Sequence, residues 1–319
     1  MLSTGLVPAN YKGKRWSGLS KKDGFKSGFI TLIGRTNVGK SSLLNKIAGR
    51  KVAIMSDKPQ TTRNRILFVF NRENSQVIFL DTPGIHKPKH RLGEQLVQVA
   101  LRTLHDVDAI LFLVEAGQPP GPGDKFIMNR FQGLKTPILL IINKIDLVKR
   151  EELLPLMEQY SKLYNFSEII PVSALTGENL SSLLGTVENY LPPGPKYYPD
   201  DVVTDRPETF IMAELVREKV LQLTSQEIPH SVAVIIEGLE ERPNEIVAVR
   251  AVIYTERESQ KGILIGKGGR MLKKIGEMAR QEIESLLGSK IYLSLWVKVK
   301  PGWRNKEEQL WSLGYRSKE

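Results

Sequence analysis

The chain has 319 residues, enough for about two domains that each bury a core. Its 25% charged and 41% hydrophobic residues are typical of a soluble globular protein, and no apolar run of about 18 residues is present to span a membrane. The sequence contains no cysteine, which excludes disulfides and thiolate metal sites and suits a cytoplasmic location, and the N-terminal stretch does not have the pattern of a secretory signal.

The net charge of +11 is concentrated at the two ends of the chain. Residues 1–27 carry six Lys/Arg against one acid, and residues 255–319 carry fourteen Lys/Arg against eight acids, so residues 28–254 are neutral overall. Basic ends indicate a polyanionic partner, although such charge can also serve solubility alone. Residues 1–27 lack apolar periodicity, and we expect a flexible basic arm there.

Residues 28–190 are expected to form an α/β domain with a mostly parallel sheet and helices on both faces. Strand and helix patterns alternate along this segment, as that architecture requires. The expected strands are 29–33, 65–70, 77–80, 109–114, 137–142 and 168–172, and the expected helices are 40–48, 92–105, 123–131, 151–164 and 178–190. Ligands bind beyond the carboxyl ends of parallel strands, so binding motifs should follow strands.

A phosphate-binding motif follows the first expected strand. The residues are Gly34-Arg35-Thr36-Asn37-Val38-Gly39-Lys40-Ser41, and a helix pattern continues from Ser42. In this G-x-x-x-x-G-K-S pattern, backbone N–H groups and the positive helix end cradle phosphates. Lys40 would reach the terminal phosphates and Ser41 would hold Mg²⁺. The complete motif between a strand and a helix predicts that the chain binds a nucleoside triphosphate.

Three further motifs follow later strands and point to guanine. In Asp81-Thr82-Pro83-Gly84, the acid can hold Mg²⁺ through water, and Gly84 can donate its N–H to the terminal phosphate. In Asn143-Lys144-Ile145-Asp146, the Asp146 carboxylate can accept two guanine N–H groups that adenine lacks. Ser173-Ala174-Leu175 is placed to pack against the guanine base. The order and spacing of these motifs resemble those of translation-factor-like GTPases.

The loop between the phosphate motif and Asp81 contains Lys58-Pro59-Gln60-Thr61-Thr62-Arg63. A threonine in a mobile loop can complete the Mg²⁺ shell when a triphosphate is bound. We favour Thr62 over Thr61, because the Thr-Arg pair resembles the equivalent loop of related GTPases. Two exposed linker threonines are the plainer alternative. The expected Mg²⁺ ligands are therefore Ser41, Thr62 and Asp81.

Two positions bear on hydrolysis. Ile85 follows Gly84 where small signalling GTPases carry a glutamine that orients the attacking water, so we expect slow intrinsic turnover. Asn37 resembles an asparagine that helps bind potassium in one branch of such GTPases, and K⁺ could then stabilise charge in the transition state. The expected catalytic residues are Lys40, Thr62, Gly84 and Asn37, and Ile85 is included among the nucleotide contacts.

Residues 191–207 are rich in proline and are expected to be a semi-rigid linker. Residues 208–319 then predict a smaller α+β domain, with helix 209–223, apolar runs 231–236 and 246–254, helix 270–287 and the alternating strand 291–300. The expected helix 270–287 has an apolar face, which consists of Leu272, Ile275, Ala279, Ile283 and Leu286. A further helix is expected before the glycine-rich turn. The resulting order, helix–strand–strand–helix–GxxG–helix–strand, is that of a bacterial-type (type II) KH domain.

The turn Gly266-Lys267-Gly268-Gly269 would let the backbone approach nucleic-acid phosphates closely. Ile263 and Ile265 would form the floor of the groove that holds unstacked bases. The expected phosphate contacts are Lys267, Arg270, Lys273 and Arg304. RNA is the expected ligand and single-stranded DNA its main rival. Trp303, at the end of a strand, is expected to cover core more readily than to stack on a base.

The whole pattern resembles the Era family of bacterial ribosome-assembly GTPases over about residues 28–316. The matching segments include 37–45, 59–63, 81–84, 204–208, 265–269 and Trp303-Arg304, whereas Thr36 stands where the family usually has proline. The resemblance implies GTP, GDP and Mg²⁺ as cofactors, and the 3′ end of small-subunit (16S) ribosomal RNA as partner. It also implies a role in 30S subunit assembly and rRNA maturation, and peripheral contact with the inner membrane face. We expect a monomer.

The residues leave other interpretations open. The chain could be a kinase or ATPase in which Asn-Lys-x-Asp is coincidental, a GTPase that binds another RNA or single-stranded nucleic acid, or an RNA-binding module with a purely structural nucleotide. In the favoured interpretation, GTP and Mg²⁺ order loop 51–65 and the segment after Asp81, which changes the surface offered to the KH domain. RNA affinity should then depend on nucleotide state, and RNA should in turn alter nucleotide affinity.

Overall fold

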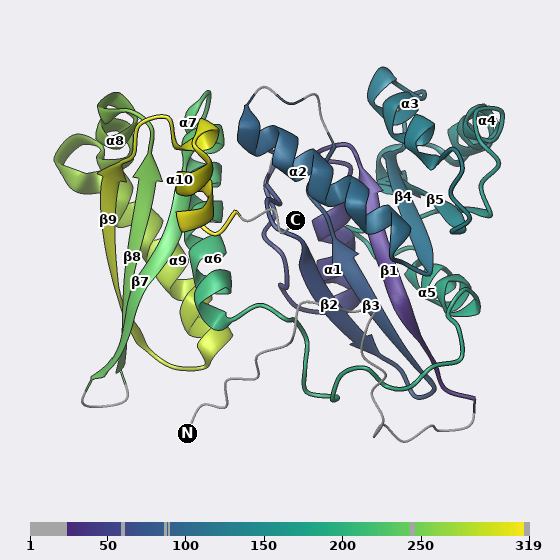
Figure 1. Ribbon diagram of the computed structural model, residues 1–319, viewed down its shortest axis with the longest axis horizontal. Helices are drawn as coiled ribbons and strands as arrows, with labels where there is room; N and C mark the ends of the chain where they lie inside the picture. The colour runs from purple at the N-terminus through teal and green to yellow at the C-terminus, as the bar shows by residue number, and fades with distance from the viewer. Residues whose placement is uncertain (1–23, 59–60, 86–87, 89, 243–245, 316–319) are drawn as a thin grey trace.

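The structure, a computed structural model, describes residues 24–58, 61–85, 88, 90–242 and 246–315. Two domains lie side by side, and the segment that joins them runs beneath the larger one in the view of Figure 1. Most of the predicted basic arm, residues 1–23, lies outside the described residues. Strand β1 begins at Lys26, however, so Lys26 and Ser27 belong to the sheet and not to the arm.

The N-terminal domain is built on a six-stranded sheet of order β2-β3-β1-β4-β5-β6. Its strands are β1 (Lys26–Gly34), β2 (Ile66–Asn71), β3 (Ser75–Asp81), β4 (Ala109–Glu115), β5 (Ile138–Asn143) and β6 (Glu168–Pro171). All pair in parallel except β2, which is antiparallel to β3. The short connection between β2 and β3 explains the exception, because a parallel pair needs a long crossover. The predicted mostly parallel sheet is confirmed.

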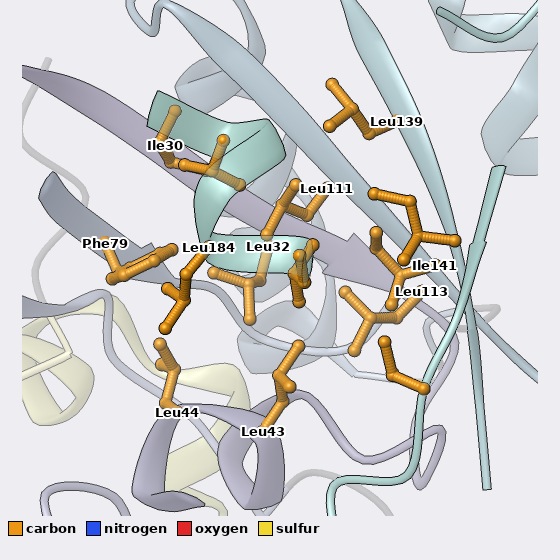
Figure 2. Close-up of a cluster of buried hydrophobic side chains, with 14 of the residues drawn as sticks. Ile30, Leu32, Leu43, Leu44, Phe79, Leu111, Leu113, Leu139, Ile141 and Leu184 are labelled. Carbon is orange, nitrogen blue, oxygen red and sulfur yellow. The ribbon is translucent and has the colours of Figure 1, made fainter. Parts of the chain in front are cut away.

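Helices cover both faces of this sheet. They are α1 (Lys40–Ala48), α2 (Arg91–Arg102), α3 (Pro122–Met128), α4 (Arg150–Ser161) and α5 (Leu180–Asn189). Figure 2 shows Leu43 and Leu44 of α1 meeting Leu184 and the strand residues of one face, and α2, α3 and α4 pack on the other. The predicted helices 92–105 and 123–131 end in the 3₁₀ turns Thr103–His105 and Asn129–Phe131.

Residues 191–207, predicted to be a semi-rigid linker, pack along the N-terminal domain. The Gln76 Oε1 atom accepts hydrogen bonds from the N–H groups of Tyr197 and Tyr198 at 2.8 and 2.9 Å, and the Val69 N–H donates to the Val203 carbonyl at 2.9 Å. Strand β2 is at the edge of the sheet, and the linker covers that edge. The linker is therefore fixed to the larger domain.

The C-terminal domain has the predicted order of elements. It contains α6 (Glu208–Leu223), α7 (Ile228–Ser231), β7 (Ala233–Arg242), β8 (Ile246–Thr255), α8 (Glu258–Ile265), α9 (Arg270–Leu287), β9 (Ile291–Val299) and α10 (Glu307–Ser312). The strands form a sheet of order β7-β8-β9, in which β8 pairs antiparallel with β7 and parallel with β9. Helices α6, α8 and α9 pack on one face, which is the arrangement of a type II KH domain.

Two local predictions in this domain were wrong. Strand β7 begins at Ala233 and not at residue 231, because Ile228–Ser231 forms the short helix α7. Leu286 of α9 is 41% exposed, whereas Leu287 packs against the core. The buried row continues from Ile283 at a spacing of four residues, and that spacing reaches Leu287. In the described part of the chain, no helix combines the length and apolar character needed to cross a membrane.

Candidate nucleotide site and nucleic-acid interface

The phosphate loop lines a cavity of about 530 Å³ at the carboxyl end of β1. Helix α1 begins at Lys40, directly after Gly39, which has a φ of +98°. A Cβ atom on Gly39 would lie 2.1 Å from the Asn143 side-chain nitrogen, so only glycine fits here. The cavity is also lined by Thr36, Asn37, Ser41, Ser42, Thr62, Gly84 and Lys144. The predicted phosphate-loop, metal and guanine motifs therefore converge on one site.

The positively charged ammonium group of Lys40 is buried inside the phosphate loop. Its Nζ donates to the carbonyl oxygens of Gly34 and Arg35 at 3.2 and 2.8 Å, and the residue is 6% exposed. Burial lowers the pKa of Lys40 to about 8, and the nearby charge of Asp81 partly opposes this shift. A bound phosphate would favour the charged form, so the group is suited to binding nucleotide phosphates.

The three predicted Mg²⁺ ligands meet at one point. The Ser41 hydroxyl lies 3.0 Å from Asp81 Oδ2 and 3.0 Å from the Thr62 hydroxyl, which lies 3.3 Å from the same carboxylate oxygen. Thr61 instead donates to the Lys58 carbonyl at 2.6 Å, which agrees with the choice of Thr62. The pairing of Thr62 with the other two ligands argues against two exposed linker threonines.

Asp81 has the features of a metal-binding carboxylate. It is fully buried, burial raises the pKa of its carboxyl group, and its second oxygen, Oδ1, has no hydrogen-bond partner among the described residues. Mg²⁺ prefers such oxygen ligands, so the residues fit the ion, and when bound it neutralises charge on the nucleotide phosphates. Ser41 and Thr62 would hold it directly and Asp81 through water.

Asn143 ties the guanine motifs to the phosphate loop. Its Nδ2 donates to the Val38 carbonyl at 2.8 Å, and its Oδ1 accepts the Ala174 N–H at 2.9 Å. Asp146 accepts a hydrogen bond from the Ser173 hydroxyl at 2.5 Å. Lys144 has a φ of +67° and pairs with Glu115 at 2.9 Å, and Leu175 is 75% exposed. The motifs after β5 and β6 thus form one assembly that can read a base.

Some predicted nucleotide residues shape the loop instead of lining the cavity. Ile85 is 3% exposed within the core, and its N–H donates to the Gly34 carbonyl at 3.2 Å, so its inclusion as a nucleotide contact is corrected. Its apolar side chain also cannot orient a water, as predicted. The Thr82 hydroxyl donates to the Leu32 carbonyl at 2.6 Å, and Arg35 pairs with Asp124 at 2.9 Å. These side chains hold the strand ends in place.

The G-x-x-G turn is open to solvent. It joins α8 to α9, and the φ angles of Gly266, Gly268 and Gly269 are +71°, +62° and +76°, which L-residues rarely adopt. The basic residues at the turn, Lys267, Arg270 and Lys273, are exposed, as is the apolar Ile263 at 53%. Ile265 is half-buried. The turn therefore offers backbone, positive charge and apolar surface together.

Arg304 and Trp303 are structural residues. Arg304 is 8% exposed, and its Nε donates to Glu256 Oε2 at 3.0 Å, which leaves the guanidinium poorly placed for a phosphate; we correct the prediction that it contacts RNA. Trp303 is fully buried, and its Nε1 donates to the Ser231 carbonyl at 2.9 Å, so the expectation that it covers core is confirmed. Trp303 packs in one buried cluster with Ala233 of β7 and Leu310 of α10.

Fold and site together define a P-loop GTPase joined to a KH domain. Residues 29–144 match a family described as 50S ribosome-binding GTPase, and residues 227–304 match the KH domain family. The GTPase Era of Alkaliphilus oremlandii is 56% identical over 292 residues, which cover 91% of this chain and 99% of the relative. The GTPase Era of Staphylococcus haemolyticus is 54% identical over 290 residues, which cover 91% and 97%. The chain belongs to the Era family of GTPases.

Solved structures agree with this assignment. A crystal structure of Era in complex with MgGDPNP and nucleotides 1506–1542 of 16S ribosomal RNA matches with a TM-score of 0.89 and 42% identity, covering 92% of this chain and 100% of the other. A point variant of Aquifex aeolicus Era bound to GDP·AlF₄⁻ matches with the same values. The expected activity, GTP hydrolysis, and the expected cofactors, GTP, GDP and Mg²⁺, are confirmed. A kinase or ATPase of another family is excluded.

Proposed function

We propose that this GTPase is a nucleotide-controlled switch that binds the 3′ end of 16S ribosomal RNA and acts in 30S subunit assembly and rRNA maturation. The observation that carries the proposal is the exposed G-x-x-G turn, with Lys267, Arg270 and Lys273 around it, in one chain with a cavity lined by the phosphate loop and Thr62. The Era relative solved with nucleotides 1506–1542 of 16S ribosomal RNA supports the choice of RNA.

A binding experiment tests this proposal. An RNA of nucleotides 1506–1542 and a scrambled RNA of equal composition are titrated with the chain loaded with a non-hydrolysable GTP analogue. We expect at least about 100-fold tighter binding to the natural sequence. Replacing Lys267 and Gly268 by Asp should abolish it, because two negative charges would face the phosphates. Lys162→Ala, at an exposed position of the GTPase domain, is the matched control. Equal binding to both RNAs, or a different RNA recovered by crosslinking in cells, would refute the proposal.

We also propose that K⁺ assists hydrolysis beside Asn37. The Asn37 side chain has its Nδ2 2.5 Å from the Asp57 carbonyl, so the phosphate loop and loop 51–65 meet at this residue. A cation held there would stabilise negative charge in the transition state. Turnover in KCl should exceed turnover in NaCl by at least about tenfold, and Asn37→Ala should remove the difference. Equal turnover in both salts would rule the proposal out.

The remaining proposals concern location and assembly. We propose a cytoplasmic monomer that contacts the inner membrane face through its basic surface, where each Lys or Arg near an anionic bilayer contributes about 1 kcal/mol. Flotation with anionic vesicles and with neutral vesicles tests the contact. Light scattering of the purified chain tests the monomer.

A further inference from the structure

The loop between α1 and β2, which carries the Mg²⁺ ligand Thr62, lies against the KH domain. Ile54 of this loop is 4% exposed and belongs to the same hydrophobic cluster as Leu215 of α6 and Ile283 of α9. On the other side, the Asn45 side chain of α1 binds the backbone of Val52 and Ala53. The start of the loop is therefore packed between the two domains.

Side chains of the C-terminal half bind three backbone groups of this loop. Glu218 of α6 accepts the Met55 N–H at 2.8 Å. Its neighbour Arg217 donates to the Thr61 carbonyl, and Arg206, just before α6, donates to the Arg65 carbonyl. Glu218 and Arg217 are both fully buried. Consecutive residues of one KH helix therefore hold both the start and the end of the loop.

Arg63, next to Thr62, is anchored inside the KH domain. It is 2% exposed, and its Nη1 donates to the Val232 carbonyl at 2.6 Å, while its Nη2 donates to the Pro229 carbonyl at 3.0 Å. Its guanidinium carbon lies 5.9 Å from the ring centroids of both Trp303 and Tyr315. A cation between aromatic rings and carbonyl groups is strongly held.

A charged cluster fixes α6 to the loop as well. Lys51 of the loop pairs with Glu218 and, at 2.6 Å, with Glu282 of α9. Lys219 of α6 pairs with the same two carboxylates, at 2.8 Å for Glu218. These groups are mostly buried, and in a low-dielectric environment such pairs constrain geometry. The contact between α6 and the loop is consequently one of defined orientation.

We infer that Arg63 and Arg217 are positioning residues for GTP hydrolysis, through which the KH domain holds Thr62 at the Mg²⁺ site. The residues on either side of Thr62 are both fixed from the KH domain, Thr61 by its carbonyl and Arg63 by its side chain. The backbone of Thr62 is thereby restricted to the conformation that places its hydroxyl beside Ser41 and Asp81. Among the described residues that line the nucleotide cavity, neither arginine is found. The inference goes beyond the proposed RNA function and holds for whichever RNA the chain binds.

The test uses the full chain and separates positioning from general stability. Arg63→Met removes the anchor of the loop. Arg217→Met is made together with Glu214→Gln, because Arg217 is paired with the buried Glu214 at 2.6 Å, and Glu214→Gln alone is its control. Thr224→Val is the control for KH stability: Thr224 is 7% exposed, and its hydroxyl donates to the Val220 carbonyl of the same helix region in the KH domain.

We expect Arg63→Met and the double variant to lower kcat by about tenfold and to raise the Mg²⁺ concentration needed for half-maximal turnover by a similar factor. Affinity for a non-hydrolysable GTP analogue should fall, whereas affinity for GDP, which needs no Thr62, should stay within about twofold. Arg63→Lys should recover part of the loss, because it keeps a cation near the Trp303 and Tyr315 rings.

The inference is overturned if these variants lose no more kcat than Thr224→Val, or if GDP affinity falls as much as analogue affinity. Should Arg63→Met fail to fold, Arg63→Lys and the double variant give the same comparison. The RNA titration described above is a separate measurement, so failure of one proposal does not imply failure of the other.

Discussion

The Ser173 hydroxyl donates a hydrogen bond of 2.5 Å to the Asp146 carboxylate, and this bond orients the group that we expect to distinguish guanine from other bases. Ser173 follows β6 and Asp146 follows β5, and these strands are neighbours in the parallel sheet. The same hydroxyl accepts the Thr176 N–H at 3.1 Å. The position of the carboxylate is therefore set by the sheet and by the turn after β6.

Asp146→Asn should move the preference of the site from guanine towards xanthine nucleotides. The amide cannot accept both guanine N–H groups, and an unpaired donor at the base costs roughly 100-fold in GDP affinity. Competition binding with GDP, XDP and ADP measures the change. Ser173→Ala removes the hydrogen bonds of the hydroxyl to Asp146 and to the Thr176 N–H but keeps the carboxylate, so GDP affinity should fall by about tenfold while the preference for guanine is kept. Undiminished GDP affinity in Asp146→Asn would contradict the assignment.

Thr62→Val should slow hydrolysis by about 100-fold while GDP affinity is retained, because the threonine hydroxyl serves the metal only with a triphosphate. Single-turnover kinetics and GDP titration give the two quantities. Thr61→Val is the matched control, since its hydroxyl bonds the Lys58 carbonyl and not the metal ligands. The assignment fails if the two variants behave alike.

Nucleotide affinity should weaken as the pH rises above about 8, the value to which burial lowers the pKa of Lys40. Phosphate binds the charged lysine, so above this pKa binding must be accompanied by proton uptake, and affinity falls by up to tenfold per pH unit. For folding the sign is opposite. The unfolded chain binds the proton up to pH 10.5 and the folded chain only to about 8, so this group adds stability as the pH rises between these values.

Titration calorimetry with GDP at pH 7, 8 and 9 tests this dependence. Lys40→Met provides the baseline, because its residual pH dependence belongs to other groups, including the base itself. Subtracting the pH dependence of GDP affinity in Lys40→Met from that in the parent protein gives the contribution of Lys40. If GDP affinity changes with pH equally in the parent and in Lys40→Met, Lys40 does not titrate in this range.

Arg304→Ala should unfold the KH domain more readily without a specific effect on RNA. The substitution leaves Glu256 largely buried and without its guanidinium partner, which costs about 3 kcal/mol in the free energy of unfolding. Urea denaturation measures this loss. At a temperature where the variant is folded, its RNA affinity should equal that of the parent. A loss of RNA affinity at unchanged stability would restore Arg304 to the RNA contacts.

Much of the nucleotide site could be predicted because its residues follow strands in a fixed order. Asp81 and Asn143 end the buried strands β3 and β5, Lys40 and Ser173 follow β1 and β6, and a parallel sheet brings such positions to one edge. Local sequence also indicated the G-x-x-G turn, since glycine is the residue that most readily adopts positive φ angles.

The contacts between the domains could not be predicted in this way. Arg217 and the Thr61 carbonyl are 156 positions apart, and an arginine in an amphipathic helix ordinarily predicts an exposed face. Arg63 looked like part of a mobile loop, although its side chain is buried in the other domain. The charged run Arg217-Glu218-Lys219 was the available signal, because three consecutive residues of a helix point in widely different directions and cannot all face solvent on a packed helix. Arg304 was misassigned for the same reason, since its partner Glu256 lies 48 positions away.

The central claim is that the bound guanine nucleotide sets the affinity of the KH domain for RNA. The most direct measurement is the dissociation constant for the RNA of nucleotides 1506–1542 with the chain loaded with GDP and then with a non-hydrolysable GTP analogue. We predict at least about tenfold tighter binding in the analogue state, and an equal factor by which RNA tightens the analogue. Identical RNA affinity in the two states would contradict the claim and leave an RNA-binding protein whose nucleotide is structural.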